Sequence, residues 1–123
     1  LVSSPNIMGY VAALTAYRYG QSWLDDLLEY LAINREILAK YVRDRLPGIS
    51  AGTPEGTYLA WLDCRKATIP GNPQEFFLEK AKVALNDGAL FGKGGEGFVR
   101  LNFGCTRATL LQGLDRMRLS LGA

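Results

Sequence analysis

The chain has 123 residues, of which 48% are hydrophobic, 21% charged and 11% aromatic, a composition typical of one globular domain. Its 14 basic and 12 acidic residues give a net charge of +2 with interleaved signs, so we expect neither nucleic-acid nor membrane partners. The sequence contains no histidine, which excludes Ser-His-Asp triads, Cys-His pairs and histidine-ligated metals. Cys64 and Cys105 do not have the spacing of a disulfide framework or a zinc site, and we expect reduced thiols, as in the cytoplasm.

Two helices are predicted in the first part of the chain. Ser4-Pro5 predicts the start of the first helix, with Ser as N-cap and Pro at the first helical position, and Gly20 predicts its end. Because Ala, Leu and Tyr crowd this segment, we expect it to be buried on more than one side. Ser22 predicts the cap of the second helix, in which leucines recur at helical spacing over roughly 25 residues until Pro47-Gly48.

Short strands and helices alternate after Gly48. Strands are predicted at Ile49–Thr53, Thr57–Asp63, Ala89–Phe91 and Phe98–Phe103. Asn72 predicts the cap of a helix that ends near Asn86-Asp87-Gly88, and Thr106 predicts the cap of a last helix. This order indicates an α+β fold, a small, mostly antiparallel sheet with helices packed on it and a long helix before it.

The strand Phe98–Phe103 carries the strongest candidate for a binding residue. Its two-residue period places Arg100 and Asn102 on one face and the apolar Val99 and Leu101 on the other. A guanidinium between large apolar residues needs an anion, and its planar fork fits a carboxylate. That anion is either an external carboxylate or an internal partner. The candidates for an internal partner are Asp63, Glu55 and Glu96.

Two other motifs are weaker. The glycine-rich run Gly92–Gly97 precedes a strand instead of opening a helix, so we interpret it as a flexible turn and not as a phosphate loop. Tyr58 and Trp61 are three residues apart on one predicted strand and therefore face opposite sides, so we expect one in the core and one near a cleft. No lysine or carboxylate pair stands out as catalytic, and no metal site is predicted.

Three segments together resemble a known family. They are PEGTYLAWLD (54–63), ALNDG (84–88) and GFVRLNFGC (97–105), and at this separation they resemble the C-terminal part of the MalY/PatB proteins. These are cystathionine β-lyase-like enzymes of the class I/II aminotransferase superfamily, which use pyridoxal 5'-phosphate. The opening Ser3-Ser4-Pro5-Asn6 and the long second helix resemble the same family, so the resemblance runs from Leu1 to about Leu121.

The resemblance implies a fold and a domain organisation. The chain would be the C-terminal small domain of a fold type I enzyme, with residues 48–123 as the α+β domain and residues 1–47 as a helical segment joining it to a large domain. A chain that begins with Leu1 and runs directly into a helix also suggests a piece of a longer protein. The resemblance further implies a homodimer.

The resemblance also implies a reaction and the residues for it. The enzyme would be a carbon-sulfur lyase that releases thiol, pyruvate and ammonia from cystathionine or cysteine thioethers. Arg100 would bind the α-carboxylate of the amino-acid substrate, while Tyr58 and Asn102 would line the cleft. No catalytic residue is expected in this chain, because the Schiff-base lysine and most cofactor contacts lie upstream in the family, and the isolated piece would be inactive. Two alternatives stay open: an aminotransferase, or a non-catalytic binding or regulatory module.

Overall fold

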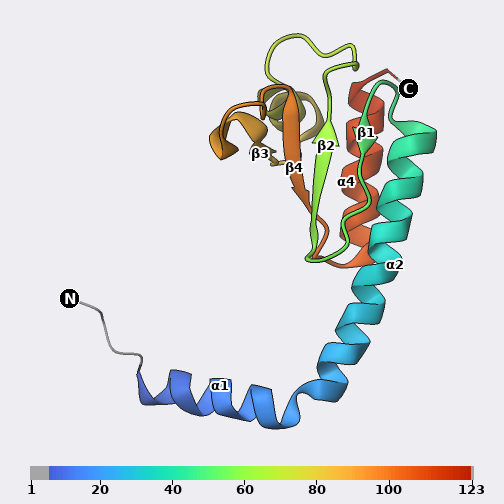
Figure 1. The fold of residues 1–123 in the computed structure, drawn as a ribbon. Helices are drawn as coiled ribbons and strands as arrows, with labels where there is room; N and C mark the ends of the chain where they lie inside the picture. The colour runs from blue at the N-terminus through green and yellow to red at the C-terminus, as the bar shows by residue number, and fades with distance from the viewer. Residues whose placement is uncertain (1–5, 123) are drawn as a thin grey trace. The chain divides into compact units, whose positions relative to one another are not determined.

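The structure is a computed structural model that describes residues 6–122 (Figure 1). The chain divides into two compact units, Leu1–Tyr30 and Leu31–Ala123. The second unit includes the C-terminal part of the long second helix. The division predicted from sequence, after residue 47, stays a prediction. The predicted helix start at Ser4-Pro5 lies outside the described residues.

The first unit contains helix α1, Ile7–Tyr19. Asn6 is its N-cap, accepting a hydrogen bond from the Gly9 amide at 2.8 Å, and the helix ends at Gly20 as predicted. The expected burial on more than one side is wrong for this chain. No residue of α1 is buried, and Tyr17 is 93% exposed, because none of its side chains belongs to the hydrophobic core.

Helix α2, Gln21–Arg45, is the long helix that the sequence predicts. It begins at Gln21, one residue before the predicted cap at Ser22. Its buried residues are Asn34, Leu38 and Val42, which recur every four residues and so form one stripe on the part of the helix in the second unit. Leu46 continues the stripe into the core just before the chain turns at Gly48.

The second unit is built on a four-stranded sheet in the order β1-β2-β4-β3, and its neighbouring strands pair antiparallel. The strands are β1 (Ser50–Ala51), β2 (Leu59–Asp63), β3 (Asn86–Asp87) and β4 (Phe98–Asn102). Ala60, Leu62 and Val99 are fully buried, while their neighbours along each strand are not. The predicted α+β architecture and the alternation along β4 are therefore confirmed.

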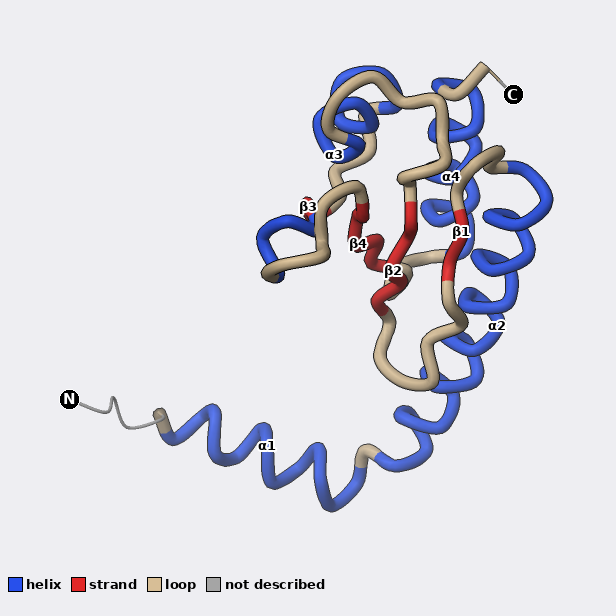
Figure 2. Tube along the Cα trace, turned by 45° about the horizontal axis from the view of Figure 1, so that its top comes forward, coloured by secondary structure: helices blue, strands red, loops and turns tan. Residues whose placement is uncertain are grey.

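Helices cover the buried face of the sheet. Helix α4, Arg107–Ser120, is capped by Thr106 as predicted, and it buries Leu110, Leu114 and Met117. It lies beside the sheet together with the C-terminal part of α2 (Figure 2). No helix within residues 6–122 is both long and apolar enough to cross a membrane.

Two sequence predictions between Asn72 and Phe91 need correction. The predicted helix is capped by Asn72, but it consists of α3 (Pro73–Phe76) and a π-helical turn η1 (Phe77–Ala81), and it ends at Lys82, whose φ is 56°. The chain leaves the helix there because the next residues pair with β4 as β3. The predicted strand Ala89–Phe91 is instead part of the 3₁₀ turn η2 (Gly88–Phe91), which Asp87 caps through the Ala89 amide at 3.1 Å.

Asn34 is the buried polar residue that ties α2 to the end of β4. Its Nδ2 donates to the carbonyl oxygens of Phe103 at 3.2 Å and of Cys105 at 3.0 Å. The side chain is fully buried, so water cannot replace these bonds. Sequence reasoning did not single out this residue, because a lone asparagine in a helix gives no sign of a distant partner.

We predict that Asn34→Ala lowers the local free energy of opening around β4 and the start of α4 by about 1–3 kcal/mol, because one buried and one part-buried carbonyl lose their donor. Native-state hydrogen exchange of the β4 and α4 amides measures this directly. Gln112→Ala, on the exposed face of α4, is the matched control and changes the opening free energy by less than about 0.5 kcal/mol. Unchanged hydrogen exchange in Asn34→Ala would contradict a stabilising role for these two hydrogen bonds.

Candidate functional site

The face of the sheet opposite the core carries the candidate site. In the register of β2, β4 and β3, Arg100 lies opposite Trp61 on one side and Asn86 on the other. The side chains of Val99 and Leu101 point to the core, so Arg100 and Asn102 share the other face. Arg100 is half-buried on the central part of this face.

The guanidinium of Arg100 is held by uncharged groups. Its Nη2 donates to Asn86 Oδ1 at 3.0 Å, and its Cζ lies 4.6 Å from the centre of the Phe91 ring. Its Nε is buried and has no hydrogen-bond partner among residues 6–122. A cation packed on an aromatic face with an unused donor is ready to accept a planar anion.

None of the internal acids considered from sequence pairs with Arg100 in the described part of the chain. Asp63 is bound to Arg65, the Glu96 carboxylate accepts from the Gly94 amide at 3.0 Å, and Glu55 is exposed. The internal ion pair is therefore absent from this structure, while the external carboxylate remains a proposal.

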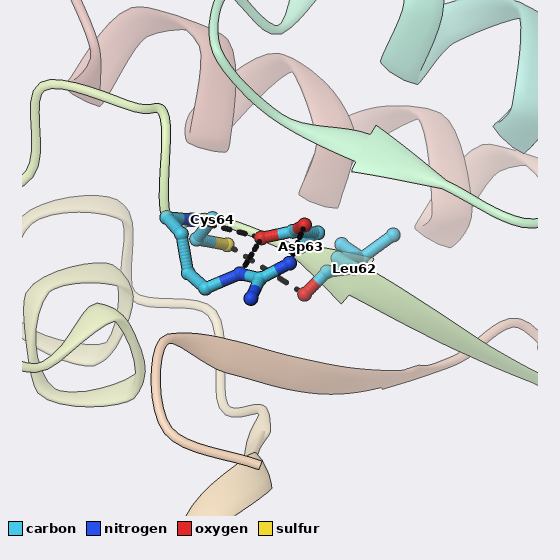
Figure 3. A network of polar contacts seen from close by, with 4 residues as sticks. Leu62, Asp63 and Cys64 are labelled. Atoms are coloured by element: carbon cyan, nitrogen blue, oxygen red, sulfur yellow. Dashed lines mark hydrogen bonds and ion pairs between the residues drawn. The ribbon is translucent and has the colours of Figure 1, made fainter. Parts of the chain in front are cut away.

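Asp63 and Arg65 form a closed ion pair at the end of β2 (Figure 3). Arg65 donates to the Asp63 carboxylate through Nε at 2.9 Å, through Nη2 at 2.7 Å and through its backbone amide at 3.1 Å. These hydrogen bonds lower the pKa of Asp63 from 3.8 to about 2, although desolvation acts in the opposite direction. The guanidinium of Arg65 also lies 4.5 Å from the centre of the Phe98 ring.

Aromatic rings connect the two arginines. Trp61 stacks on Phe98 with ring centres 5.6 Å apart, and it meets Phe91 edge-on at 5.5 Å. Such pairs contribute about 0.5–1.5 kcal/mol each beyond the area that they bury. Arg100 and Arg65 thus lie at opposite ends of one row of rings, each packed against a different phenylalanine.

A contact between two glycines fixes the segment that carries Phe91. A Cβ atom on Gly88 would lie 2.3 Å from the carbonyl oxygen of Gly95, and one on Gly95 would lie 2.0 Å from that of Gly88. No side chain fits at either position, so the glycine-rich run folds back tightly onto η2. The sequence predicts a flexible turn between two strands, whereas the run packs closely against Gly88 and connects the turn η2 to β4.

Tyr58 and Asn102 lie together at the other end of β4. Asn102 Oδ1 accepts from the Gly104 amide at 2.8 Å, and a Cβ on Gly104 would lie 3.1 Å from the Tyr58 ring. Neither side chain is hydrogen-bonded to Arg100, so their role in lining a cleft remains a prediction. The expectation that one of Tyr58 and Trp61 is in the core is wrong, since they are 48% and 37% exposed; Tyr58 precedes β2, where strand alternation does not apply.

The thiols offer no nucleophile. Cys64 is 3% exposed, and burial raises its pKa to about 12; burial also raises the pKa of Cys105. Both thiols are therefore protonated at neutral pH, and a protonated thiol is a poor nucleophile. Within residues 6–122, no three His, Cys, Asp or Glu side chains form a group able to hold a metal. The site can bind and orient a ligand, but it holds no evident group to transform one.

Sequence reasoning missed three residues of this site: Asn86, Phe91 and Arg65. Asn86 was assigned to a helix end and Phe91 to a strand, so neither was placed next to Arg100. The available signal was the two-residue spacing of Asp63 and Arg65, which permits a local ion pair and so argues against Asp63 as the partner of Arg100.

We predict a pH-dependent contribution of Asp63 to the stability of the sheet. Because the pKa of Asp63 is lower in the folded chain, its stabilisation is present above about pH 4 and is lost as the pH falls towards 2. Asp63→Asn therefore lowers the opening free energy of the β2 and β4 amides at pH 6. The decrease is at most about 1 kcal/mol, because the ion pair is partly exposed. At pH 2 the substitution leaves this free energy unchanged. Hydrogen exchange between these pH values measures the difference, with the exposed Glu79→Gln as control. A difference that persists at pH 2 would contradict the ion-pair origin.

Comparison with known proteins shows what this chain is similar to. It is 40% identical to the protein MalY of Escherichia coli and 38% identical to the cystathionine beta-lyase PatB of Bacillus subtilis, over 92% and 94% of this chain. The crystal structure of the PLP-bound C-S lyase from Staphylococcus hominis matches 97% of this chain and 32% of that one, with a TM-score of 0.88 and 30% identity. An aspartate aminotransferase of Pyrococcus horikoshii is 26% identical over 90% of this chain and 29% of its own length. No family model matches the sequence.

The chain spans less than a third of the length of these relatives, 29% of MalY and 30% of PatB. The part that it matches has the four helices and the small antiparallel sheet of the C-terminal domain of fold type I enzymes. The family uses pyridoxal phosphate, and solved relatives are described as PLP-bound. By sequence and by fold, the chain is a homologue of part of the MalY and PatB proteins, and it has the class I/II aminotransferase fold of their solved, PLP-dependent relatives.

Proposed function

We propose that this chain supplies the substrate-binding arginine of a pyridoxal phosphate-dependent carbon-sulfur lyase. The observation that carries the proposal is the state of Arg100, whose guanidinium has no acidic partner among residues 6–122 and whose Nε is buried and unused. An uncompensated, half-buried cation is costly unless an anion binds it. The α-carboxylate of an amino acid has the charge and the planar shape that the fork of an arginine binds.

The residues described here do not form a site for the cofactor itself. A lysine that reacts with pyridoxal phosphate is desolvated or lies beside another cation, whereas all five lysines of this chain are exposed. No other group of this site within residues 6–122 is suited to proton transfer at Cα, since the pKa of each thiol is raised, Cys64 is buried and Asp63 is paired with Arg65. We therefore assign the cofactor to a large domain outside this chain and derive no step of its chemistry.

The contribution of Arg100 is binding and orientation. Charge-assisted hydrogen bonds from the guanidinium fix the carboxylate, and this limits the directions in which the other bonds of Cα point. For a cysteine thioether, the overall reaction breaks the Cβ–S bond, removes the Cα proton, and with water yields a thiol, pyruvate and ammonia. Asn86 and Phe91 hold the guanidinium in place, so little conformational freedom is lost when the carboxylate binds.

Similarity to larger relatives also suggests partners for this chain. We infer that the enzyme is a homodimer, that a large domain completes the active site, and that an amino acid such as cystathionine is the substrate. A cytoplasmic location agrees with the two free cysteines, which are usual in reducing compartments. Candidate lining residues are Tyr58 and Asn102, which lie on the same face as Arg100 or beside it.

We predict that Arg100→Ala, made in the complete natural polypeptide loaded with pyridoxal phosphate, lowers kcat/KM for a cysteine thioether by about 100-fold or more. The loss follows from removing a charge-assisted contact of about 1.5–3 kcal/mol and the orientation that it provides. Arg100→Lys recovers only part of the activity, because an ammonium group cannot bind both carboxylate oxygens in the same plane.

The control for Arg100→Ala is Arg43→Ala. Arg43 is an exposed arginine on α2 that pairs with Asp44 at 3.1 Å, and its loss leaves kcat/KM unchanged. An effect of Arg100→Ala below about threefold, less than 1 kcal/mol, would contradict the carboxylate role.

An aminotransferase is the second candidate, because the chain is also related to an aspartate aminotransferase. The two activities differ in their products. We predict that the complete polypeptide releases pyruvate from cystathionine without any keto-acid acceptor, which a coupled assay for pyruvate measures. Amino-group exchange that depends on an added keto acid, without pyruvate release, would establish the aminotransferase instead. Neither reaction in a protein that binds the cofactor would favour a binding or regulatory module.

A further inference from the structure

We propose that Arg65 is a positioning residue for substrate binding, which neutralises Asp63 and thereby keeps Arg100 free for the substrate carboxylate. The inference deepens the proposed function and rests on it. It concerns the one acidic residue that the sheet places on the same face as Arg100 and within reach of it.

Strand register brings Asp63 close to Arg100. In the antiparallel pair β2·β4, Trp61 lies opposite Arg100 and Asp63 lies opposite Phe98. Asp63 and Arg100 are therefore diagonal neighbours on one face, a relation in which residues lie about 7–8 Å apart and long side chains can meet. An acid and an arginine in this position would ordinarily form an ion pair, and an ion pair would occupy the fork that the substrate needs.

The hydrogen bonds from Arg65 use the Asp63 carboxylate, and this prevents an ion pair between Asp63 and Arg100. Both oxygens of the carboxylate accept from Arg65, and the backbone amide of Arg65 adds a third hydrogen bond. The Arg65 side chain is itself held, since its guanidinium packs on Phe98 and a Cβ on Gly97 would lie 2.6 Å from its Cγ. The Arg65 side chain is 60% exposed, and an ion pair this exposed contributes little to stability. Its main effect is therefore to balance the charge of Asp63.

Aromatic rings also separate the Asp63–Arg65 ion pair from Arg100. Trp61 and Phe98 are the residues on the other diagonal, and their stacked rings lie between the two charged ends. Arg100 is drawn to the far end by Asn86 and Phe91. Among residues 6–122, this face thus holds the Asp63–Arg65 ion pair and, apart from it, the Arg100 guanidinium, with aromatic rings between the two.

Loss of the Arg65 charge would expose an uncompensated carboxylate on this face. The Asp63 anion would attract Arg100 and repel the incoming carboxylate, and both effects weaken binding. At about 8 Å near a protein surface, screened by salt, a unit charge alters an equilibrium by about tenfold. The effect falls on ligand binding, because neither Arg65 nor Asp63 is placed to take part in bond breaking.

The test uses the complete natural polypeptide with pyridoxal phosphate bound. Arg65→Gln keeps the stem against Phe98 and Gly97 while removing the charge. The probe is 3-(methylthio)propionate, which has a carboxylate and a thioether but no amino group to react, and calorimetry measures its Kd. We expect Arg65→Gln to raise this Kd, and KM for cystathionine, by about tenfold, with kcat changed less than about twofold.

Rescue separates the charge effect from a structural one. Asp63→Asn in the Arg65→Gln background restores Kd to within about twofold of the wild type, and Arg65→Lys retains near-normal binding because it keeps the charge. If Arg65→Gln does not fold, as judged by circular dichroism, Arg65→Lys in 0.05 M and 1 M salt replaces it; we expect Kd to rise with salt as the ion pair is screened. Arg43→Ala is the control on a different ion pair.

Two results would overturn the inference: an unchanged Kd in Arg65→Gln, or a raised Kd that Asp63→Asn does not lower. A salt-independent Kd in Arg65→Lys would overturn it in the fallback experiment. Failure of the proposed function gives a different signature, because Arg100→Ala would then bind the probe as the wild type does. Tight binding that depends on Arg100 but not on Arg65 would refute this inference and leave the proposed function intact.

Discussion

The candidate site depends on one constraint: the guanidinium of Arg100 is half-buried and has no acidic partner among residues 6–122. Arg100 lies centrally on a sheet face, where Asn86 provides a hydrogen-bond acceptor and Phe91 an aromatic ring, and no acid within residues 6–122 pairs with it. Such a cation is costly in the absence of an anion, and the cost is recovered when a ligand supplies one. The rest of the face follows from this constraint, because Asp63, the acid diagonal to Arg100, is paired with Arg65, and aromatic rings separate this pair from Arg100.

The fold supplies the rigidity that such a site needs. The two groups that hold the Arg100 guanidinium, Asn86 and Phe91, come from β3 and η2, and the sheet packs on a core that α2 and α4 close from the other side. The close approach of Gly88 to Gly95 fixes the turn that carries Phe91, and the buried Asn34 holds α2 to the end of β4. In the absence of these ties, the guanidinium would sample many rotamers and bind a carboxylate less well.

Sequence reasoning found what local patterns encode. The caps at Asn72 and Thr106, the end of α1 at Gly20 and the alternation along β4 follow from neighbouring residues alone, and they identified Arg100. It failed where pairing between distant segments decides the outcome. Asn86 forms a strand only because β4 is beside it, and Lys82 ends the helix in a left-handed conformation that no turn residue announces. The apolar side chains of α1 predicted burial, but no residue of this helix is buried in the structure.

The central claim is that Arg100 binds the carboxylate of an amino-acid substrate. A crystal structure of the complete natural polypeptide with pyridoxal phosphate and a bound carboxylate ligand tests it most directly. We expect both carboxylate oxygens within about 3 Å of the Arg100 guanidinium nitrogens, with Asn86 still bound to Nη2 and Asp63 still paired with Arg65. A carboxylate held by other residues, or an Arg100 turned to Asp63 in that structure, would contradict it.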